Sequence, residues 1–579
     1  MRQTLRTEVL VVGGGTGGVA AALTAARMGA QTVLVSETPW LGGMLTSAGV
    51  AAPDGNELMA WQTGLWGEFL RAIAQRQPGG LDHAWVSFFT FEPKVAADLF
   101  AEWVKATPNL TWLVGEVPQA VLRQGNRILG VELTTLTLHA QITIDATELG
   151  DLLALGEIPH RWGWEWQADT QEPSAPSAPT ALTQTYSVQA PTWIVVLQDY
   201  GEGATAPEIP PSPLWDEHKF NGAWAGYDPL HFLNYGRLPG NRFMLNWPQQ
   251  GNDYGVGLER LIGSAQERQA FCQEARWHAQ DFARYVQQQL GRRYALAEDT
   301  FPQFPRQLGG GAYALHPYYR ESRRLMGVTT IHEQDILPSA PPPVDAQGHY
   351  TGIAIGNYPN DHHYPGMELP LMPKSIRWGG RWTGTPFVIA YTSLIPQTVE
   401  GFLVAEKNIS VTHIANGATR LQPLVMGIGQ GAGWLAATAI RQGKSLHQLV
   451  GTLDLKPLIQ ECRQAIFPFF NLPPQHPEWE AWQLQTLNTF DPTVPLPPEV
   501  AIAQPTPMTM SPRMQTVTGE FAKLGEQAYQ LRTEQQSWPL VTLHPTVNDR
   551  LQTYRNGQRI TVTGFINPYA PWMRVEHVA

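Results

Sequence analysis

A short loop at residues 356–366, GNYPNDHHYPG, concentrates side chains suited to proton transfer. It places one carboxylate, Asp361, directly before two histidines, His362 and His363. A histidine beside an acid can take or give a proton near neutral pH, so these three residues are the candidate catalytic groups. A solvated surface loop is the alternative interpretation. An Asp-x-His pair alone is too little for a metal centre, so we predict no metal.

A basic run, Arg320-Glu321-Ser322-Arg323-Arg324, offers a second kind of chemistry. Guanidinium groups bind carboxylates through paired hydrogen bonds, so Arg320 and Arg323 are candidates for holding a substrate carboxylate. Three charges on one turn or strand cannot all point inward. A structural role in internal ion pairs is therefore an equally good interpretation.

The elements that must position these groups begin with Glu8–Glu37, EVLVVGGGTGGVAAALTAARMGAQTVLVSE. The order is a buried strand, a glycine turn, an alanine-rich helix, a second buried strand and an acid. Gly13, Gly15 and Gly18 have the spacing that allows a tight turn, a close approach to a pyrophosphate and close helix packing. Glu37, 19 positions after Gly18, can accept hydrogen bonds from an adenosine ribose and disfavours NADP. The stretch predicts a dinucleotide site, and a glycine-rich turn in an ordinary α/β domain is the alternative.

Composition limits the remaining possibilities. The 579 residues are 43% hydrophobic, enough for a large core and two or three domains. A formal net charge of −11 argues against a general nucleic-acid or anionic-membrane surface. Cys272 and Cys462 form no C-x-x-C, which excludes a redox-active dithiol. The apolar run Val9–Ala26 belongs to the strand–turn–helix unit, so we expect no membrane span and a cytoplasmic location.

Periodicity predicts further elements along the chain. We expect helices at Asn56–Gln75, Glu92–Lys105 and Ala265–Leu290, and strands at Thr111–Val114, Gln119–Arg123, Ile128–Leu138 and Gln141–Asp145. Gly427–Arg441 is typical of a second glycine-rich turn leading into a helix. Residues 511–579 alternate in polarity and contain an Asn556-Gly557 turn, which predicts a small β module of OB or SH3-like type. Its seven Lys and Arg against five Asp and Glu favour a docking or structural role over nucleic-acid binding.

These stretches together resemble the FAD-dependent oxidoreductases of the glutathione-reductase fold. The glycine stretch is followed by Leu41-Gly42-Gly43-Met44-Leu45, as in that family. Four further motifs match: Ile144-Asp145-Ala146-Thr147, Arg320–Arg324, Tyr358–His363, and Arg420–Pro423 continuing through Met426–Gly433. The resemblance runs from about residue 5 to about residue 445. Glu148 departs from it, because the family usually has glycine there.

The resemblance implies FAD as the cofactor and assigns residues to it. The pyrophosphate would lie over Gly13, Gly15, Thr16, Gly17 and Gly18, with the ribose on Glu37. Gly42, Gly43 and Met44 would pass near the ribityl chain or ring, Val117 would contact the adenine, and Ala146 and Thr147 would lie at the strand end. Gly429 and Gln430 would open the final helix toward the flavin, with close helix packing as the alternative. His363 matches the family histidine, and His413 becomes a candidate substrate-binding residue near the ring.

The expected architecture is α/β. A discontinuous Rossmann-type FAD-binding domain at residues 1–160 and 385–450 would carry an inserted α+β substrate domain at 161–384. A helical or proline-rich arm at 451–510 would lead to the β-barrel-like module at 511–579.

The expected activity is that of an FAD-dependent oxidoreductase, a dehydrogenase or oxidase that transfers a hydride between the flavin and a small organic substrate. No second glycine fingerprint exists for an NADPH domain, so oxygen, a quinone or a protein remains open as the electron acceptor. The alternative is a flavoprotein that acts mainly as a binding or scaffold protein through residues 511–579. A protein partner for that module, but no nucleic acid, fits either hypothesis.

Overall fold

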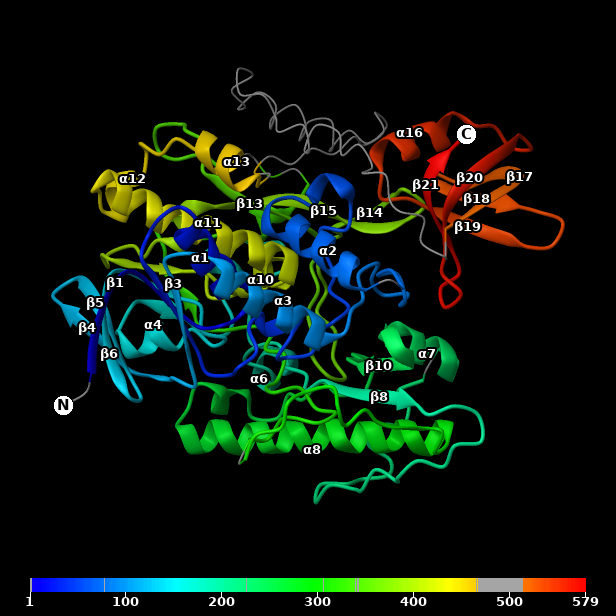
Figure 1. Cartoon of the computed structure of the whole chain (residues 1–579), viewed down its shortest axis with the longest axis horizontal. Coiled ribbons are helices and arrows are strands. Elements are labelled where there is room, and N and C mark those ends of the chain that lie inside the picture. Colours follow the sequence, from blue (N-terminus) through cyan, green and yellow to red (C-terminus); the bar gives the residue numbers. More distant parts are fainter. Residues whose placement is uncertain are drawn as a thin grey trace.

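The computed structural model describes residues 3–464, except Pro78, Ala225, Arg306, Ser339, Pro341 and Pro342, together with Ile466 and residues 514–579 (Figure 1). Most of the arm expected at 451–510 lies outside the described residues. Its described part contains the short helix α13 (Lys456–Cys462).

A mainly parallel sheet forms the centre of the protein. β1 (Gln3–Val12) pairs in parallel with β2 (Thr32–Ser36) and β6 (Leu136–Asp145), and β2 pairs with β3 (Leu110–Val114). The runs Val9–Val12 and Thr32–Ser36 are fully buried, as expected for strands covered on both faces. β16 (Phe402–Val404) pairs with the end of β6, so the sheet is completed by a segment far along the chain.

Two antiparallel strands extend this sheet, and one predicted strand boundary is wrong. β4 (Pro118–Gln124) pairs with β5 (Arg127–Leu133), and β5 pairs with the first half of β6. The predicted strand Ile128–Leu138 is in fact divided at Thr134-Thr135. Threonine is β-branched and favours strands, so this turn has no sequence signature.

Two glycine- and alanine-rich helices cross at the centre. α1 (Thr16–Arg27) packs on β1 and β2, and α11 (Gln422–Gln442) packs on α1 and on β13 (Gly352–Tyr358). α2 (Gly64–Arg76) and α3 (Pro93–Ala106) flank them, and α2 starts later than the predicted helix Asn56–Gln75. Among the described residues, α11 alone combines the length and hydropathy of a membrane-crossing helix, and 89% of its apolar window is buried inside the protein.

The inserted residues form a second layer, at the bottom of Figure 1. An antiparallel sheet runs in the order β11 (Tyr294–Leu296), β8 (Val195–Asp199), β10 (Arg242–Leu245), β9 (Arg237–Leu238). The long helix α8 (Ala265–Leu290) lies beside it and has the bounds predicted for it. Ser264 and Glu267 form a capping box at its start, which explains why this boundary was readable.

A third sheet spans the expected domain boundary. β15 (Arg381–Ala390) pairs through its first part with β14 (Ser375–Trp378) and through its second part with β13. The expected boundary between residues 384 and 385 falls inside β15, so these three strands cannot be divided there. Because β13 also packs on α11, this sheet belongs structurally with the Rossmann-type part.

The C-terminal residues close into a five-stranded barrel, red in Figure 1, with strand order β17-β18-β19-β21-β20. The strands are β17 (Met514–Gly525), β18 (Ala528–Arg532), β19 (Ser537–Val541), β20 (Arg559–Ile566) and β21 (Met573–Val578), and helix α16 (Pro545–Thr553) joins β19 to β20. This topology fits the OB alternative.

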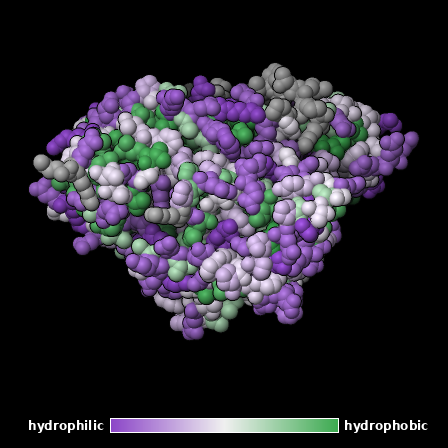
Figure 2. All heavy atoms as spheres, turned by 60° about the horizontal axis from the view of Figure 1, so that its bottom comes forward, coloured by the Kyte–Doolittle hydropathy of each residue, from purple (hydrophilic) through white to green (hydrophobic). Residues whose placement is uncertain are grey.

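The barrel is not independent of the body. Thr542 N donates to Gly379 O at 2.8 Å, in the turn between β14 and β15, and Asn567 Nδ2 donates to Asp82 Oδ1 at 2.8 Å. Trp572 packs edge-on against Phe88 of the body. On the face of the molecule in Figure 2, hydrophobic residues occur in scattered groups among polar ones.

Candidate functional site

A cavity of about 680 Å³ brings several candidate residues together. It lies between the inserted residues, the loop that follows β13 and the N-terminal end of α11. Val50 connects it to the glycine region, because Val50 N donates to Met44 O at 2.9 Å. Its polar lining includes Asp54, Tyr235, Asn246, Asp253, Arg320, Asp361, His362, His363, Arg420 and Gln422.

His363 is held between two carboxylates. Its Nδ1 lies 2.7 Å from Asp253 Oδ2 and its Nε2 lies 3.0 Å from Asp361 Oδ2. Burial opposes ionisation of Asp253, but Arg320 and His363 outweigh it and lower the pKa of Asp253 to about 2. The two contacts fix the orientation of the imidazole ring, and a histidine held in this way at a cavity is suited to proton exchange with a ligand.

Two arginines extend this pair of contacts into a row of alternating charges. Arg320 NH1 lies 3.1 Å from Asp253 Oδ1, and Arg420 NH2 lies 3.0 Å from Asp361 Oδ2. Against the cost of burial, His363 and Arg420 hold the pKa of Asp361 well below its usual range. In the row Arg320–Asp253–His363–Asp361–Arg420, each carboxylate thus contacts one arginine and His363. Arg320 lies at the cavity, but its guanidinium is already paired.

His362 points away from this row. Its Nε2 donates to Ile414 O at 3.0 Å, and its Nδ1 accepts from the Tyr364 hydroxyl at 2.8 Å. Burial, with the nearby charge of His413, lowers the pKa of His362 to about 3, so the ring is neutral. Because the Tyr364 proton goes to His362, His413 Nε2 must donate to the Tyr364 oxygen, 2.5 Å away.

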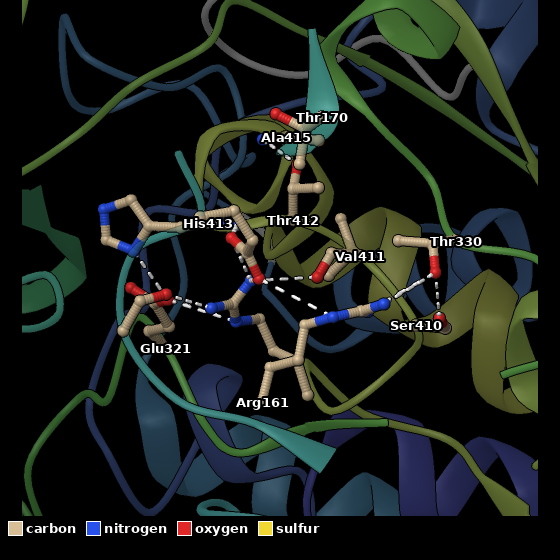
Figure 3. A network of polar contacts seen from close by, with 12 residues as sticks. Arg161, Thr170, Glu321, Thr330, Ser410, Val411, Thr412, His413 and Ala415 are labelled. Atoms are coloured by element: carbon tan, nitrogen blue, oxygen red, sulfur yellow. Dashed lines mark hydrogen bonds and ion pairs between the residues drawn. The ribbon is translucent and has the colours of Figure 1, made fainter. Parts of the chain in front are cut away.

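His413 belongs to a buried polar network behind the cavity wall (Figure 3). Its Nδ1 lies 2.8 Å from Glu321 Oε1, and both side chains are fully buried. Arg324 pairs with Glu321 at 3.3 Å and with Glu165 at 2.9 Å. His413 therefore supports Tyr364 from behind and does not line the cavity, contrary to its assignment as a substrate-binding residue.

The three arginines of the basic run point to three places. Arg320 faces the cavity side, and Arg324 joins the buried network. Arg323 pairs with Asp151 at 3.0 Å, at the start of α4 (Asp151–Leu155), and donates to Leu149 O at 2.9 Å. Arg323 is not among the residues that line the cavity, and its contacts are those of the ion-pair alternative, so its binding of a substrate carboxylate stays a prediction.

Asp54 is a cavity residue that sequence reasoning missed. Burial, with the charges of Glu57 and Asp361, raises the pKa of Asp54 to about 7. Its turn is locked to the end of β13, because Asn357 N donates to Asn56 Oδ1 at 2.8 Å and Asn56 Nδ2 donates to Ile355 O at 2.9 Å. A carboxyl group that titrates near neutral pH in a cavity is suited to proton exchange.

The predicted glycine positions come together around the start of α1. Gly13 has φ +118°, and a Cβ there would overlap the carbonyl of Ala146. Gly18 is equally close to the Gly13 carbonyl, and the Thr16 hydroxyl donates to Gly42 O at 2.8 Å. The α1 N-cap, Gly15, supplies no side-chain cap. The turn, the Gly42–Met44 segment and Ala146–Thr147 thus form one cradle, which suits an anionic group.

An unexpected carboxylate already lies in this cradle. Gly17 N donates to Glu406 Oε1 at 2.7 Å, and Lys407 Nζ bridges Glu406 Oε2 at 3.2 Å and Glu148 Oε2 at 2.7 Å. Burial raises the pKa of Glu406 to about 7, although Lys407 opposes this. Glu148 Oε1 is buried without a hydrogen-bond partner among the described residues. These carboxylate oxygens can accept hydrogen bonds from a hydroxylated chain such as the ribityl group of FAD, whereas a diphosphate would need the Gly17 N–H that Glu406 occupies.

Glu37 and Val117 lie at the outer end of the cradle. Glu37 is exposed at the end of β2. Val117, between β3 and β4, is 36% exposed, and its N–H and carbonyl each lie 3.3 Å from Thr134 Oγ1. Both positions leave polar groups accessible beside the sheet.

Gly429 and Gln430 do not open the final helix. α11 begins at Gln422, with Leu421 as N-cap, and its start lies at the cavity. Gly429 packs against the carbonyl of Gly17, while Gln430 accepts from Leu65 N at 2.9 Å and donates to Cys462 O at 2.8 Å. The close-packing alternative is therefore correct for these residues. The N-terminal dipole still faces the site, but from Leu421 and Gln422.

Among the described residues, no group of three or more His, Cys, Asp or Glu is placed to hold a metal ion.

Structures similar in part include GidA from Aquifex aeolicus, with 17% identity over 24% of this chain and 25% of that one and a TM-score of 0.18. p-Nitrophenol 4-monooxygenase PnpA from Pseudomonas putida DLL-E4 has 12% identity over 34% and 48% of the chains and a TM-score of 0.22. Thioredoxin reductase from T. acidophilum has 20% identity over 24% and 35% and a TM-score of 0.16. The matched part thus spans between a quarter and a half of those proteins. The family model described as FAD dependent oxidoreductase matches residues 8–463, most of the sequence. The chain therefore belongs to this family and is an FAD-dependent oxidoreductase with FAD as its cofactor.

Proposed function

We propose that this oxidoreductase transfers a hydride between FAD and a small organic substrate held in the cavity beside Asp54 and His363. The observation that supports this most strongly is the set of groups in the cavity wall and the contact of that wall with the glycine cradle. The cavity contains a carboxyl group whose pKa is raised to about 7, a histidine fixed by two carboxylates and the N-terminal end of α11. Val50 joins that wall to the Gly42–Met44 segment of the cradle.

Different residues of the cradle would contact different parts of the cofactor. Gly13, Gly15, Thr16, Gly17 and Gly18 would hold the diphosphate, Glu37 the ribose and Val117 the adenine. Gly42, Gly43, Met44, Ala146 and Thr147 would flank the chain that leads to the ring. When bound, FAD supplies the group that accepts or returns a hydride.

The protein's own groups would manage the proton and the charge. Asp54, when ionised, takes a proton from the substrate heteroatom as the neighbouring carbon is oxidised. His363 is fixed by Asp253 and Asp361 at the same cavity, where it would exchange a proton with the substrate or stabilise negative charge on the reacting atoms. The dipole of α11 favours negative charge at the same end of the cavity.

An anaerobic titration of the FAD-loaded protein tests this function. Alcohols, amines and carboxylic acids are added in turn to the wild type, to Asp54→Asn, and to Asp98→Asn as a control on the exposed face of α3. One substrate class should bleach the visible flavin bands, and Asp54→Asn should slow bleaching by about 10²–10⁴-fold while the control does not. Bands that no compound bleaches would refute hydride transfer from a small molecule. Equal rates in wild type and Asp54→Asn would remove Asp54 from the reaction.

The alternative, a binding or scaffold function through the barrel, has less support. The β19–α16 side of the barrel is engaged by the body, where Met59 N donates to Leu543 O at 3.0 Å and Gly379 N donates to Gln527 Oε1 at 3.1 Å. These contacts favour a structural role for this side. We propose no partner for the remaining barrel surface.

A further inference from the structure

The charges that line the cavity restrict what it can bind. The two arginines there are 1% and 2% exposed, and each donates to internal acceptors. Arg320 NH1 donates to Ala190 O at 2.6 Å and to Thr192 Oγ1 at 2.8 Å, besides pairing with Asp253. Arg420 NH1 donates to the Tyr318 hydroxyl at 2.6 Å. A carboxylate ligand would have to break these contacts to reach Arg420 or NH1 of Arg320, and at NH2 of Arg320 it would compete with Asn246 Oδ1, 3.4 Å away.

A cationic ligand is disfavoured for a different reason. In the row Arg320–Asp253–His363–Asp361–Arg420, each carboxylate is already paired with an arginine and bonded to His363. Asp54 makes no ion pair among the described residues, but burial raises its pKa to about 7, so it is partly uncharged at neutral pH. Glu368 is exposed and therefore screened by solvent. An ammonium group would find no unpaired, fully ionised and buried carboxylate in this lining.

An apolar ligand would leave polar groups without water. The non-aromatic apolar lining consists of Val50, Pro248, Met367 and Leu421, and four tyrosines, Tyr235, Tyr318, Tyr358 and Tyr364, add rings that each carry a hydroxyl group. Gln422 is 1% exposed, and its Oε1 has no hydrogen-bond partner among the described residues. Displacing water from such a surface costs free energy unless the ligand replaces the hydrogen bonds.

The polar groups that remain uncommitted include both donors and acceptors. Tyr235 has its pKa raised well above the ordinary value by burial and by Asp54, so its hydroxyl stays protonated and can donate. Gln422 Oε1 and ionised Asp54 accept. Hydroxyl groups donate and accept at the same atom, so a ligand that carries several of them satisfies this mixture without adding charge.

We propose that the cavity binds an uncharged, hydroxyl-rich molecule, such as a cyclic polyol or a small sugar. This rests on the proposed function, in which the cavity is the substrate site. Oxidation of a secondary alcohol would break one C–H and one O–H bond and form a C=O bond. The hydride would leave with both electrons to FAD, and the hydroxyl proton would go to Asp54.

Three ring compounds of similar size test the proposal by binding alone. myo-Inositol is neutral and hydroxyl-rich, cyclohexanecarboxylate is an anion and cyclohexylamine is a cation. Each is titrated into the oxidised FAD-loaded protein and followed by saturation-transfer NMR and by the shift of the flavin absorption bands. D-Glucose and sorbitol are added as further neutral probes.

We expect the neutral probes to bind and the charged ones to bind at least about tenfold more weakly. Tyr235→Phe and Gln422→Leu should each weaken polyol binding about five- to tenfold, the effect of one lost hydrogen bond. The matched controls Tyr200→Phe and Gln288→Leu lie on exposed surface outside the cavity and should bind as the wild type does.

Stronger binding of the carboxylate or the amine would overturn the proposal, as would silence of all three hydroxyl-rich probes. Neither result would bear on the proposed hydride transfer, because the anaerobic titration tests that reaction separately. Bleaching of the flavin by another compound class, without polyol binding, would refute the substrate class and leave the proposed function standing.

Discussion

Replacing Gly429 with alanine should damage the protein far more than replacing Gly427, although both residues lie inside α11. A Cβ on Gly429 would lie 2.1 Å from the carbonyl oxygen of Gly17. A Cβ on Gly427 would meet Ala354 Cβ as its nearest neighbour, at 3.3 Å. The Gly17 carbonyl belongs to the first turn of α1, so it cannot move away without disturbing the FAD cradle.

The two substitutions differ only in how closely the added Cβ would pack against its neighbours. Alanine is favoured over glycine in a helix interior by about 1 kcal/mol at either position. Overpacking costs about 1–3 kcal/mol, and a backbone obstacle belongs at the upper end or beyond. We therefore expect Gly429→Ala to lower the free energy of unfolding by about 2 kcal/mol, and Gly427→Ala to leave it unchanged or raise it by up to about 1 kcal/mol.

Thermal unfolding of the two variants and the wild type measures this difference. Quenching of flavin fluorescence during FAD titration measures the cradle directly, and Gly429→Ala should bind FAD more weakly while Gly427→Ala binds it normally. A Gly429→Ala protein that melts and binds FAD like Gly427→Ala would refute the packing of α11 on the glycine turn.

Three further predictions concern the charged groups and the barrel. Asp54 has a folded-state pKa of about 7, above its unfolded value, so its contribution to stability is present in acid and is lost as pH rises through 7. Asp54→Asn should therefore lose less stability than the wild type between about pH 4 and about pH 7 in thermal melts, and parallel curves would contradict the raised pKa. Asp253→Asn leaves Arg320 and His363 beside an uncharged partner and should cost about 3 kcal/mol at neutral pH, whereas the exposed control Asp299→Asn should cost under about 1 kcal/mol. Since the pKa of Asp253 is lowered to about 2, the wild-type advantage over Asp253→Asn should be full above about pH 4 and fade toward pH 2, and a gap that persists there would count against an ionic role. Deleting residues 514–579 should lower the melting temperature of the rest, because Phe88 loses Trp572 and Asp82 loses Asn567; an unchanged melting temperature would show that the barrel is only tethered.

The elements with local signals were predictable from the sequence. β2 (Thr32–Ser36) is the second buried strand expected before Glu37, and α8 runs over Ala265–Leu290 as expected, because a buried β-branched run and a capping box mark them within a few residues. The glycine spacing of Gly13–Gly18 likewise requires only its neighbours to be recognised. FAD and the family follow from these local features.

The start of α11 was predicted too late because glycine has two opposite uses. In Gly427–Gly433 the glycines resemble a turn, yet in the structure they lie inside a helix, and Gly429 and Gly433 let α11 approach α1 closely. Pro423, in the first turn of the helix, was the signal that could have corrected the boundary.

The cavity itself could not be read from local patterns. Asp54 occurs in a Pro-Asp-Gly sequence that predicts only a turn, and the contact that holds this turn, from Asn357 N to Asn56 Oδ1, spans about 300 residues. Asp253 and Glu406 are likewise single acids without a motif, and their roles depend on His363 and Gly17 far away in the chain. His363 was recognised, but its position between Asp253 and Asp361 depends on a contact across 110 residues.

A crystal structure of the FAD-loaded protein tests the central claim most directly. We expect the diphosphate to lie on the Gly13–Gly18 turn. The flavin ring should lie at the N-terminal end of α11, open to the cavity with Asp54 and His363. A ring bound away from that cavity, or a diphosphate that does not contact the turn, would contradict it.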